Sequence, residues 1–314
     1  MDVIFCGTPQ FAVPTLKALA DNGFNVRLVV SQPDRPSGRG LATVPTPVKQ
    51  FALEHGLPVT QPEKIKNNVE FRAQLEQIAP EVIVVVAYGR IIPQWMLDLP
   101  PLGNINVHAS LLPKYRGAAP IQWAIARGEQ FTGVTTMRLD AGLDTGDMLL
   151  KADLPIEPDD TAETLAPRLS ALGGPLLIET LNGLKNGTLL RTPQDHREAT
   201  LAPILKKEDG RIDWNRTATD IWNRLRGFTP WPGAFTTFRG KNLNVWKAQP
   251  AASGMEPLAP GELHTQGEHL YIGCGENTIL QVFSLQPEGK KRMTAKDFVN
   301  GYKPKPNETL ESRS

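Results

Sequence analysis

The sequence has few cysteines and no long apolar run, and each shortage excludes a class of protein. Its 314 residues include 2 cysteines, Cys6 and Cys274, too few for the disulfide framework of a secreted protein and without metal-ligand spacing. We interpret both as packed thiols. No stretch of about 18 apolar residues is present, so we expect no contact with a membrane. The first residues lack the pattern of a signal peptide, so we expect a cytoplasmic protein.

Net charge is also nearly absent, at +1, although the two ends of the chain differ slightly. Residues 206–314 carry 16 basic and 12 acidic side chains, which leaves 18 and 21 for residues 1–205. The positive excess permits an anionic partner near the C-terminal end without requiring one. A chain of 314 residues, 40% of them hydrophobic, is long enough for two domains with separate cores.

Strand and helix signals alternate in the first half of the chain. Asp2–Phe5 and Val26–Val30 are short apolar strands, with helical spacing of apolar residues between them. Glu81–Ala87 is almost continuously β-branched, as in a parallel strand covered on both faces. Ile105–Ala109 predicts a further strand, and Ala118–Arg127 the helix after it. This alternation predicts an α/β domain with an open, mostly parallel sheet of Rossmann-like βαβ units, which binds ligands beyond the C-terminal ends of its strands.

The pattern changes after about residue 155. Thr161–Leu184 predicts one long helix, and the polar, irregular stretch that follows suits a linker. Gly233–Leu285 contains short strand signals separated by turn residues, which predict a small β-barrel of OB-fold type. We therefore expect a catalytic domain over residues 1–188, a linker over 189–206 and a β-barrel domain over 207–314.

Three polar residues share one face of the strand that ends near Ala109. Asn106, His108 and Ser110 alternate with apolar residues, so they point to the same side of a buried sheet. Burying such groups without partners is costly, which favours a functional site. A core histidine with ordinary turn hydrogen bonds is the alternative that the strand pattern alone leaves open.

A second polar segment, Asp140–Asp147, combines aspartates with glycines and predicts a tight loop with exposed backbone groups. It lacks the spacing and the terminal glutamate of a calcium-binding EF-hand loop. By itself the segment fits an ordinary turn equally well.

Two common enzyme classes fit the sequence poorly. Ser110 follows His108 on one strand face, a poor geometry for a serine nucleophile and its base, and no Gly-x-Ser-x-Gly elbow is present. The first turn, Gly7–Phe11, is not the Gly-x-Gly-x-x-Gly fingerprint of a nicotinamide dehydrogenase.

Together these segments resemble the family of formyltransferases that use 10-formyltetrahydrofolate. The resemblance covers nearly the whole chain, and its most specific part is Asn106–Pro113 followed by Leu143–Asp147. The resemblance implies that Asn106, His108 and Asp144 are the catalytic residues. It implies a folate site at Ser110, Leu111, Leu112 and Pro113, with a pterin pocket formed by Val86, Ala87, Tyr88, Gly89, Arg90, Asp140 and Gly142.

These residue types suit formyl transfer to an amine. An oxyanion develops when the amine attacks the formyl carbon, and the amide of Asn106 or a protonated His108 can donate to it. One such donor is worth about 3 to 4 kcal/mol. Histidine exchanges protons near neutral pH, and Asp144 would orient His108 and stabilise its charged form. The reaction needs no metal and no covalent nucleophile.

The resemblance also implies that the acceptor is the methionine of initiator methionyl-tRNA. Ser31–Lys49 is interpreted as a long loop without secondary structure that enters the tRNA acceptor end. Arg211–Trp214, Pro230–Ala234 and Leu285–Met293 resemble the C-terminal domain of the tRNA-acting members. The expected tRNA contacts are Arg35, Arg39, Lys49, Lys206, Lys207, Lys290, Lys291 and Arg292.

Two alternatives stay open. An N-formyltransferase for an amino-sugar nucleotide or another small amine would share the catalytic residues without affinity for tRNA. A catalytically silent RNA-binding protein on the same scaffold would lack one of the three catalytic residues, and all three are present. We expect a monomer, with tryptophans 214, 222, 231 and 246 in the barrel core rather than stacked on bases.

Overall fold

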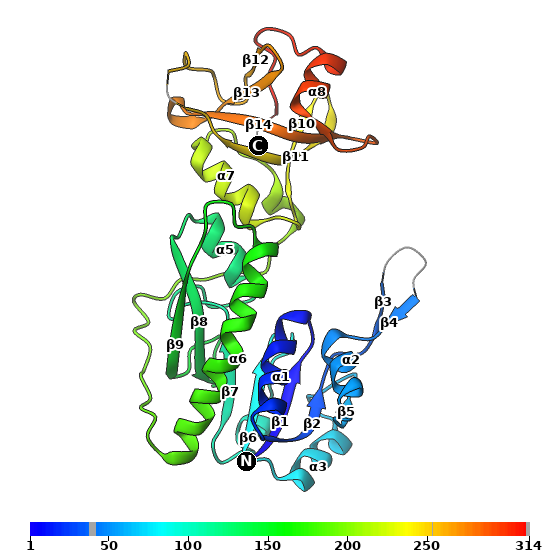
Figure 1. Ribbon diagram of the computed structural model, residues 1–314, viewed down its shortest axis with the longest axis vertical. Coiled ribbons are helices and arrows are strands. Elements are labelled where there is room, and N and C mark those ends of the chain that lie inside the picture. The colour runs from blue at the N-terminus through cyan, green and yellow to red at the C-terminus, as the bar shows by residue number, and fades with distance from the viewer. Residues whose placement is uncertain (38–41, 253, 312–314) are drawn as a thin grey trace. The chain divides into compact units, whose positions relative to one another are not determined.

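The computed structural model describes residues 1–37, 42–252 and 254–311, which fold as two compact units with a main sheet each (Figure 1). Residues 1–120, 131–155 and 166–202 form the first unit, and the rest of the chain belongs to the second. No helix among the described residues is long and apolar enough to cross a membrane.

A seven-stranded sheet with the order β5-β2-β1-β6-β7-β8-β9 organises the first unit. Its strands are β1 (Asp2–Gly7), β2 (Asn25–Val30), β5 (Val59–Thr60), β6 (Val82–Val86), β7 (Asn104–His108), β8 (Phe131–Arg138) and β9 (Met148–Pro155). The five neighbouring strands β5, β2, β1, β6 and β7 pair in parallel. β8 and β9 add antiparallel pairs at one edge of the sheet. The expected open, mostly parallel sheet is therefore confirmed.

Helices cover both faces of this sheet. They are α1 (Val13–Asp21), preceded by the 3₁₀ turn η1 (Gln10–Ala12), α2 (Pro47–Glu54), α3 (Val69–Ile78), α4 (Gln94–Leu97) and most of α6 (Ala162–Asn186). Nearly all of α5 (Pro120–Ala126) belongs to the second unit. Gly173 and Gly174 bring α6 against β7 and α1, since an added Cβ would lie 3.0 Å from Val107 and 3.1 Å from Ala18. Side chains of α3 and α4 pack on the opposite face with Ile83 of β6.

A hairpin occupies part of the segment that the sequence predicts to be a loop. β3 (Arg35–Ser37) pairs antiparallel with β4 (Ala42–Val44), and α2 begins directly after Thr46, whose hydroxyl accepts from the Lys49 backbone N–H. The prediction of a loop without secondary structure is therefore wrong here. Proline holds its own backbone extended at Pro36, which suits strand pairing as well as an open loop.

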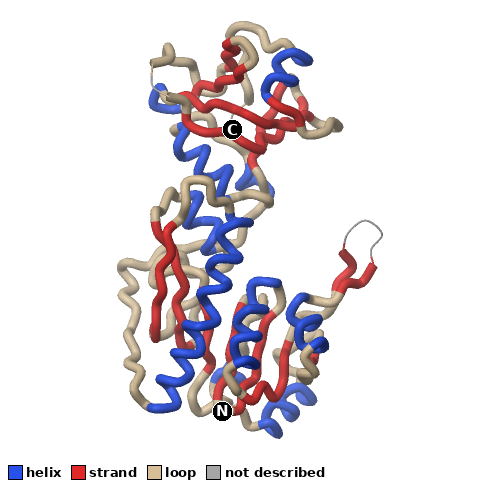
Figure 2. The backbone as a smooth tube through the Cα atoms, in the orientation of Figure 1, coloured by secondary structure: helices blue, strands red, loops and turns tan. Residues whose placement is uncertain are grey.

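The second unit contains an antiparallel six-stranded sheet, shown in red in Figure 2. Its elements are η2 (Lys207–Gly210), α7 (Ala218–Gly227), β10 (Ala234–Phe238), β11 (Lys241–Pro250), β12 (Leu263–Gln266), β13 (His269–Gly273), η3 (Gly275–Asn277), β14 (Ile279–Pro287), β15 (Met293–Thr294) and α8 (Ala295–Tyr302). The C-terminal segment bridges the two edges, since Glu311 pairs with Thr237 of β10 and Thr309 with Glu262 beside β12. This arrangement confirms the small antiparallel β domain.

The aromatic residues of this domain are only partly in its core. Trp214 is fully buried in this core, and the partly buried Trp222 packs against the core. Trp246 is half-buried, with the Arg292 guanidinium 5.3 Å from its ring. Trp231 is 55% exposed, so its prediction as a core residue is wrong. It lies in the turn between α7 and β10 rather than on a strand, so no sheet face covers it.

Both cysteines are buried free thiols, as expected. Burial raises the pKa of Cys274 to about 12 and raises that of Cys6 further still. Neither is therefore ionised near neutral pH, and both serve as packing groups.

Much of the segment predicted as a linker packs on the first unit. Figure 2 shows the chain after α6 returning along β9 without regular structure. Thr192 forms a bridge with Met148, Leu201 forms one with Arg116, and Gln194 is only 6% exposed. The domain limits at 188 and 206 stay predictions, but residues 189–202 are part of the first unit's structure.

Candidate active site

The alternation of β7 sends Asn106 and His108 to one side of the sheet. Val107 points toward α6, and its partner across the β7–β8 pair, Thr136, shares a hydrogen bond with Thr180 of α6. Its neighbours Asn106 and His108 therefore face away from α6. The strand pattern predicted this common face from the sequence alone.

The loop that follows β7 is tied down by its own hydrogen bonds. The Ser110 hydroxyl donates to the Lys114 carbonyl at 2.6 Å. Thr135 of β8 donates to the Ser110 carbonyl at 2.7 Å and accepts from the Leu112 N–H at 3.1 Å. Lys151 of β9 donates to the Leu112 carbonyl at 2.5 Å, and its partial burial lowers the pKa of its ammonium. Ser110 and Leu112 are buried within this loop, whereas Leu111 and Pro113 are partly exposed.

The His108 ring is oriented by the carbonyl of Tyr115, which lies 2.9 Å from its Nε2. A carbonyl only accepts, so Nε2 carries a proton in this arrangement. Nδ1 then faces the Oδ2 of Asp144 at 3.7 Å. That distance is too long for a hydrogen bond but suits attraction between a carboxylate and a protonated ring. His108 is 6% exposed, so few water molecules compete with these contacts.

Asp144 is held from a second loop, which connects β8 to β9. Its Oδ2 accepts from the Gly117 N–H at 2.8 Å. Its backbone has a φ of 51°, in the left-handed region that is costly for a residue with a Cβ. The same loop contains a turn at Asp140, whose carboxylate accepts from Gly142 N–H at 3.0 Å and from the Thr145 hydroxyl at 2.8 Å. Asp140 thus shapes the loop, while Asp144 reaches the histidine.

Asn106 is the third expected catalytic residue, and its side chain has no protein partner among the residues that the structure describes. It is half-buried on the same face as His108 and lies opposite Val85 of β6 in the sheet. Asn106, His108 and Asp144 therefore lie around one end of β7, with the amide of Asn106 left free to donate.

The segment after β6 adds exposed backbone to the same neighbourhood. Ala87 and Gly89 have positive φ values of 45° and 80° and are exposed. The Tyr88 side chain between them is 1% exposed in the core, where burial raises the pKa of its phenol. The Tyr88 carbonyl accepts from the Gln32 amide at 3.1 Å, and Arg90 donates to the same glutamine at 2.9 Å. Any contact of Tyr88 with a ligand is thus through its backbone.

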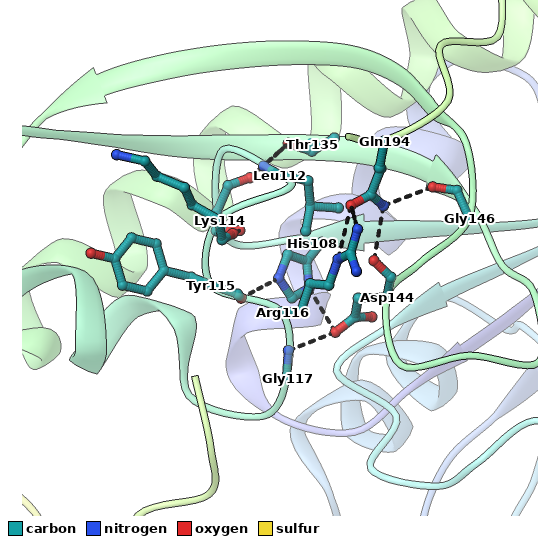
Figure 3. A network of polar contacts seen from close by, with 11 residues as sticks. His108, Leu112, Lys114, Tyr115, Arg116, Gly117, Thr135, Asp144, Gly146 and Gln194 are labelled. Atoms are coloured by element: carbon teal, nitrogen blue, oxygen red, sulfur yellow. Dashed lines mark hydrogen bonds and ion pairs between the residues drawn. The ribbon is translucent and has the colours of Figure 1, made fainter. Parts of the chain in front are cut away.

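Two further residues belong to the site, and neither of them has a role predicted from the sequence (Figure 3). Arg116 and Gln194 are both 6% exposed. Arg116 donates to Gln194 Oε1 from Nε at 3.0 Å and from Nη2 at 2.7 Å. The Gln194 amide donates to the carbonyls of Asp144 and Gly146 at 2.8 and 2.7 Å. Gln194 lies in the irregular stretch after α6, where no periodicity or motif marks it.

The basic residues expected to contact tRNA lie mostly at exposed positions. Arg35 on β3, Lys206 and Lys207 at η2, and Lys290, Lys291 and Arg292 between β14 and β15 are exposed, and Arg39 lies outside the described residues. Lys49 differs, because its ammonium forms an ion pair with Asp34. That hydrogen bond lowers the pKa of the Asp34 carboxyl.

Potential metal ligands do not gather anywhere in the described part of the chain. No group of three or more histidine, cysteine, aspartate or glutamate side chains is placed there to hold a metal ion.

Family models match both units of the chain. The formyl transferase model matches residues 1–181, and the model of the formyl transferase C-terminal domain matches residues 204–303. The residues between these ranges, including Gln194, are matched by neither. The fold and the site thus define an enzyme of the formyl transferase class.

Relatives that match nearly the whole chain identify the family within this enzyme class. The methionyl-tRNA formyltransferase of Koribacter versatilis is 66% identical over 304 residues, which are 97% of this chain and 96% of the relative. That of Acidobacterium capsulatum is 59% identical over 301 residues, 96% of each chain. The chain belongs to the methionyl-tRNA formyltransferase family.

Solved structures of other proteins share the fold. WlaRD, a sugar 3N-formyl transferase, superposes with a TM-score of 0.68 at 18% identity, over 93% of this chain and 99% of that one. HypX from Aquifex aeolicus, in complex with tetrahydrofolic acid, gives 0.58 at 17% identity, over 99% of this chain and 50% of that one. At these identities the similarity concerns the fold alone.

Proposed function

We propose that this enzyme transfers the formyl group of 10-formyltetrahydrofolate to the free amino group of methionyl-initiator tRNA, giving the N-formylmethionyl-tRNA used in translation initiation. One observation carries the proposal: Asn106, His108 and Asp144 gather around the end of β7 in a chain 66% identical, over nearly its full length, to a methionyl-tRNA formyltransferase. The enzyme acts as a monomer in the cytoplasm without a metal ion.

Asn106 stabilises the charge that develops at the formyl oxygen. The acceptor nitrogen forms a bond to the formyl carbon, and the carbonyl π electrons move onto oxygen. The amide N–H of Asn106 has no protein partner in the described structure, so it is available to donate to this oxyanion. The tetrahedral intermediate then collapses, the carbon–nitrogen bond to the folate breaks, and the formyl group stays on the acceptor.

His108 handles the proton that this exchange requires. The attacking amine loses one proton and the folate nitrogen gains one. Nε2 of His108 is occupied by the Tyr115 carbonyl, so Nδ1 is the ring atom available to accept the proton and return it. The resulting imidazolium is stabilised by Asp144 Oδ2, 3.7 Å away, and by the Tyr115 carbonyl.

The folate site lies on both sides of the catalytic residues. Ala87 and Gly89 present backbone groups in a left-handed conformation, and Leu111 and Pro113 present partly exposed apolar surface. Asp140 and Gly142 complete the pocket by shaping the loop that carries Asp144. Val86, Tyr88, Ser110 and Leu112 support it from buried positions, and Arg90 fixes the turn through Gln32.

The tRNA contacts are proposed at the basic residues of both units. Phosphate attraction needs exposed cations rather than a fixed geometry. Arg35, Lys206, Lys207, Lys290, Lys291 and Arg292 meet that requirement in the described structure. Arg39 completes the set from its position in the sequence, and Lys49 supports α2 as well as any phosphate contact.

The test is a formylation assay with three acceptors in parallel. Methionyl-tRNA, glycinamide ribonucleotide and an amino-sugar nucleotide are incubated separately with the enzyme and 10-formyltetrahydrofolate, and the tRNA products are resolved on an acid-urea gel. We expect formylation of the tRNA alone. Formylation of a small amine alone would retain the catalytic residues and reject the acceptor and every tRNA contact above.

A further inference from the structure

The buried amide of Gln194 connects the two loops on either side of His108 (Figure 3). Its Nε2 donates to the carbonyls of Asp144 and Gly146, at 2.8 and 2.7 Å. Its Oε1 accepts two hydrogen bonds from Arg116, at 3.0 and 2.7 Å. The amide's oxygen and both its N–H groups are thus used inside the protein.

The orientation of this amide follows from the chemistry of its partners. A guanidinium only donates, so the group facing Arg116 is the oxygen. Carbonyls only accept, so the group facing Asp144 and Gly146 is the NH₂. Glutamate lacks the two donors, and asparagine is shorter by one methylene. Glutamine therefore meets both requirements where its closest relatives in size and chemistry do not.

Three consecutive residues of the loop that follows β7 complete a closed ring of contacts. Tyr115 holds His108 through its carbonyl, Arg116 binds Gln194, and the Gly117 N–H binds the Asp144 carboxylate at 2.8 Å. The ring therefore runs from His108 through Tyr115, Arg116, Gln194 and Asp144 back to His108. Shifting any one member moves Asp144 relative to the His108 ring.

The segment around Gln194 is itself fixed to the first unit. His196 Nδ1 lies 3.2 Å from two nitrogens of Arg116, and the Thr200 hydroxyl accepts from the Tyr115 N–H at 2.9 Å. The Arg116 backbone N–H donates to the Thr200 carbonyl at 2.9 Å, and the Ala202 N–H donates to the Arg116 carbonyl at 2.7 Å. The segment therefore braces the site.

We propose that Gln194 is a positioning residue for formyl transfer, which holds the Asp144 backbone in its left-handed conformation and so sets the distance between the Asp144 carboxylate and His108. This inference rests on the proposed function. Gln194 itself makes no contact with the reacting atoms, because its polar groups are all engaged by protein. Its effect on the reaction passes through Asp144.

The experiment combines Gln194→Met with Asp144→Asn. Gln194→Met keeps the length of the side chain but removes the donors and the acceptor. We expect kcat to fall about 10- to 100-fold, because small displacements of catalytic groups cost that much, with KM for tRNA and folate changed less than about 3-fold. In the Asp144→Asn background we expect less than about a 3-fold further loss, since the two residues act through one another.

A matched control separates positioning from general destabilisation. Thr180→Val also removes buried hydrogen bonds in the first unit, to Thr136 and to the Leu176 carbonyl, away from the site. It should lower the melting temperature and leave kcat unchanged at a temperature where the enzyme is folded. If Gln194→Met does not fold, Gln194→Glu, which keeps an acceptor toward Arg116, takes its place.

Amide hydrogen exchange provides a readout that is independent of activity. Gln194→Met should speed exchange in residues 110–117, 139–147 and 192–202 and leave the rest of the first unit unchanged. Undiminished kcat, full additivity with Asp144→Asn, or exchange that increases uniformly would each overturn the proposal. A wild-type enzyme that formylates no methionyl-tRNA would instead reject the proposed function, while the exchange result would still report on the ring.

Discussion

The residues around the end of β7 and the basic residues proposed to contact tRNA differ in what holds them in place. His108 and Asp144 each have a fixed backbone partner, Tyr115 and Gly117, at hydrogen-bond distance. The exposed side chains of Lys290 and Lys291, by contrast, form no hydrogen bond or ion pair within the described part of the chain. Bond-making chemistry requires atoms placed within a fraction of an ångström, whereas attraction to phosphate falls off gradually with distance. The two sets should therefore respond to substitution in different kinetic parameters.

The largest effect is expected for His108→Ala. It removes the group that exchanges the proton, and general acid–base groups contribute about 10²- to 10⁴-fold. We expect kcat to fall by about that factor while KM for methionyl-tRNA and the melting temperature change little. His269→Ala, which removes an exposed histidine on β13, is the control. A His108→Ala enzyme with wild-type turnover would show that the proton follows another path.

Asn106 allows a sharper test of the oxyanion contact. Asn106→Ala removes one donor, which should cost about 10²- to 10³-fold in kcat. Asn106→Asp conserves volume but places an anion where negative charge develops, so its kcat should fall further than that of Asn106→Ala. Single-turnover formylation measures both variants. If the aspartate variant is the faster of the two, the oxyanion does not lie at this side chain.

A smaller effect is expected at the β14–β15 turn. The double variant Lys290→Ala/Lys291→Ala should raise KM for methionyl-tRNA about 3- to 10-fold, leave kcat unchanged, and reduce the salt dependence of binding by about two phosphate contacts. Lys296→Ala is the matched control, because that lysine already pairs with Glu268 at 2.6 Å. A fall in kcat without a change in KM would reject the phosphate contact.

The same contrast explains what the sequence could predict. The alternation of β7 and the resemblance to a family indicated Asn106, His108 and Asp144, because period-2 patterns and short motifs record local geometry. The ring through Arg116 and Gln194 joins residues 78 positions apart, and no local pattern encodes such a contact. Trp231 was mistaken for a core residue because apolar character does not reveal whether a turn has anything packed over it.

The fold was predictable for a related reason. The β-branched run that forms β6 and the helical spacing of α6 are signals contained within single elements. The β3–β4 hairpin was missed, because extended proline-containing segments suit an open loop and a paired strand equally. Pairing depends on which segments meet, and that information lies outside either segment.

Substitution of Lys49 tests whether this residue has a structural role or contacts tRNA, and it is expected to have the smallest effect of the substitutions considered. It is one of the basic residues assigned to tRNA, yet its ammonium pairs with Asp34 and lowers the pKa of that carboxyl. A depressed carboxyl pKa adds stability above the pKa of the unfolded state, and this stability is lost as pH falls through the folded-state value. Lys49→Met should therefore have a lower free energy of unfolding than wild type at pH 7, by no more than about 1 kcal/mol in denaturant titrations. This difference in stability should vanish in acid. If KM for tRNA rises while stability at pH 7 is unchanged, Lys49 belongs with the phosphate contacts. If stability falls and KM is unchanged, the charge of Lys49 stabilises the packing of the hairpin and α2 through Asp34. The proposed tRNA contacts of the first unit are then Arg35 and Arg39.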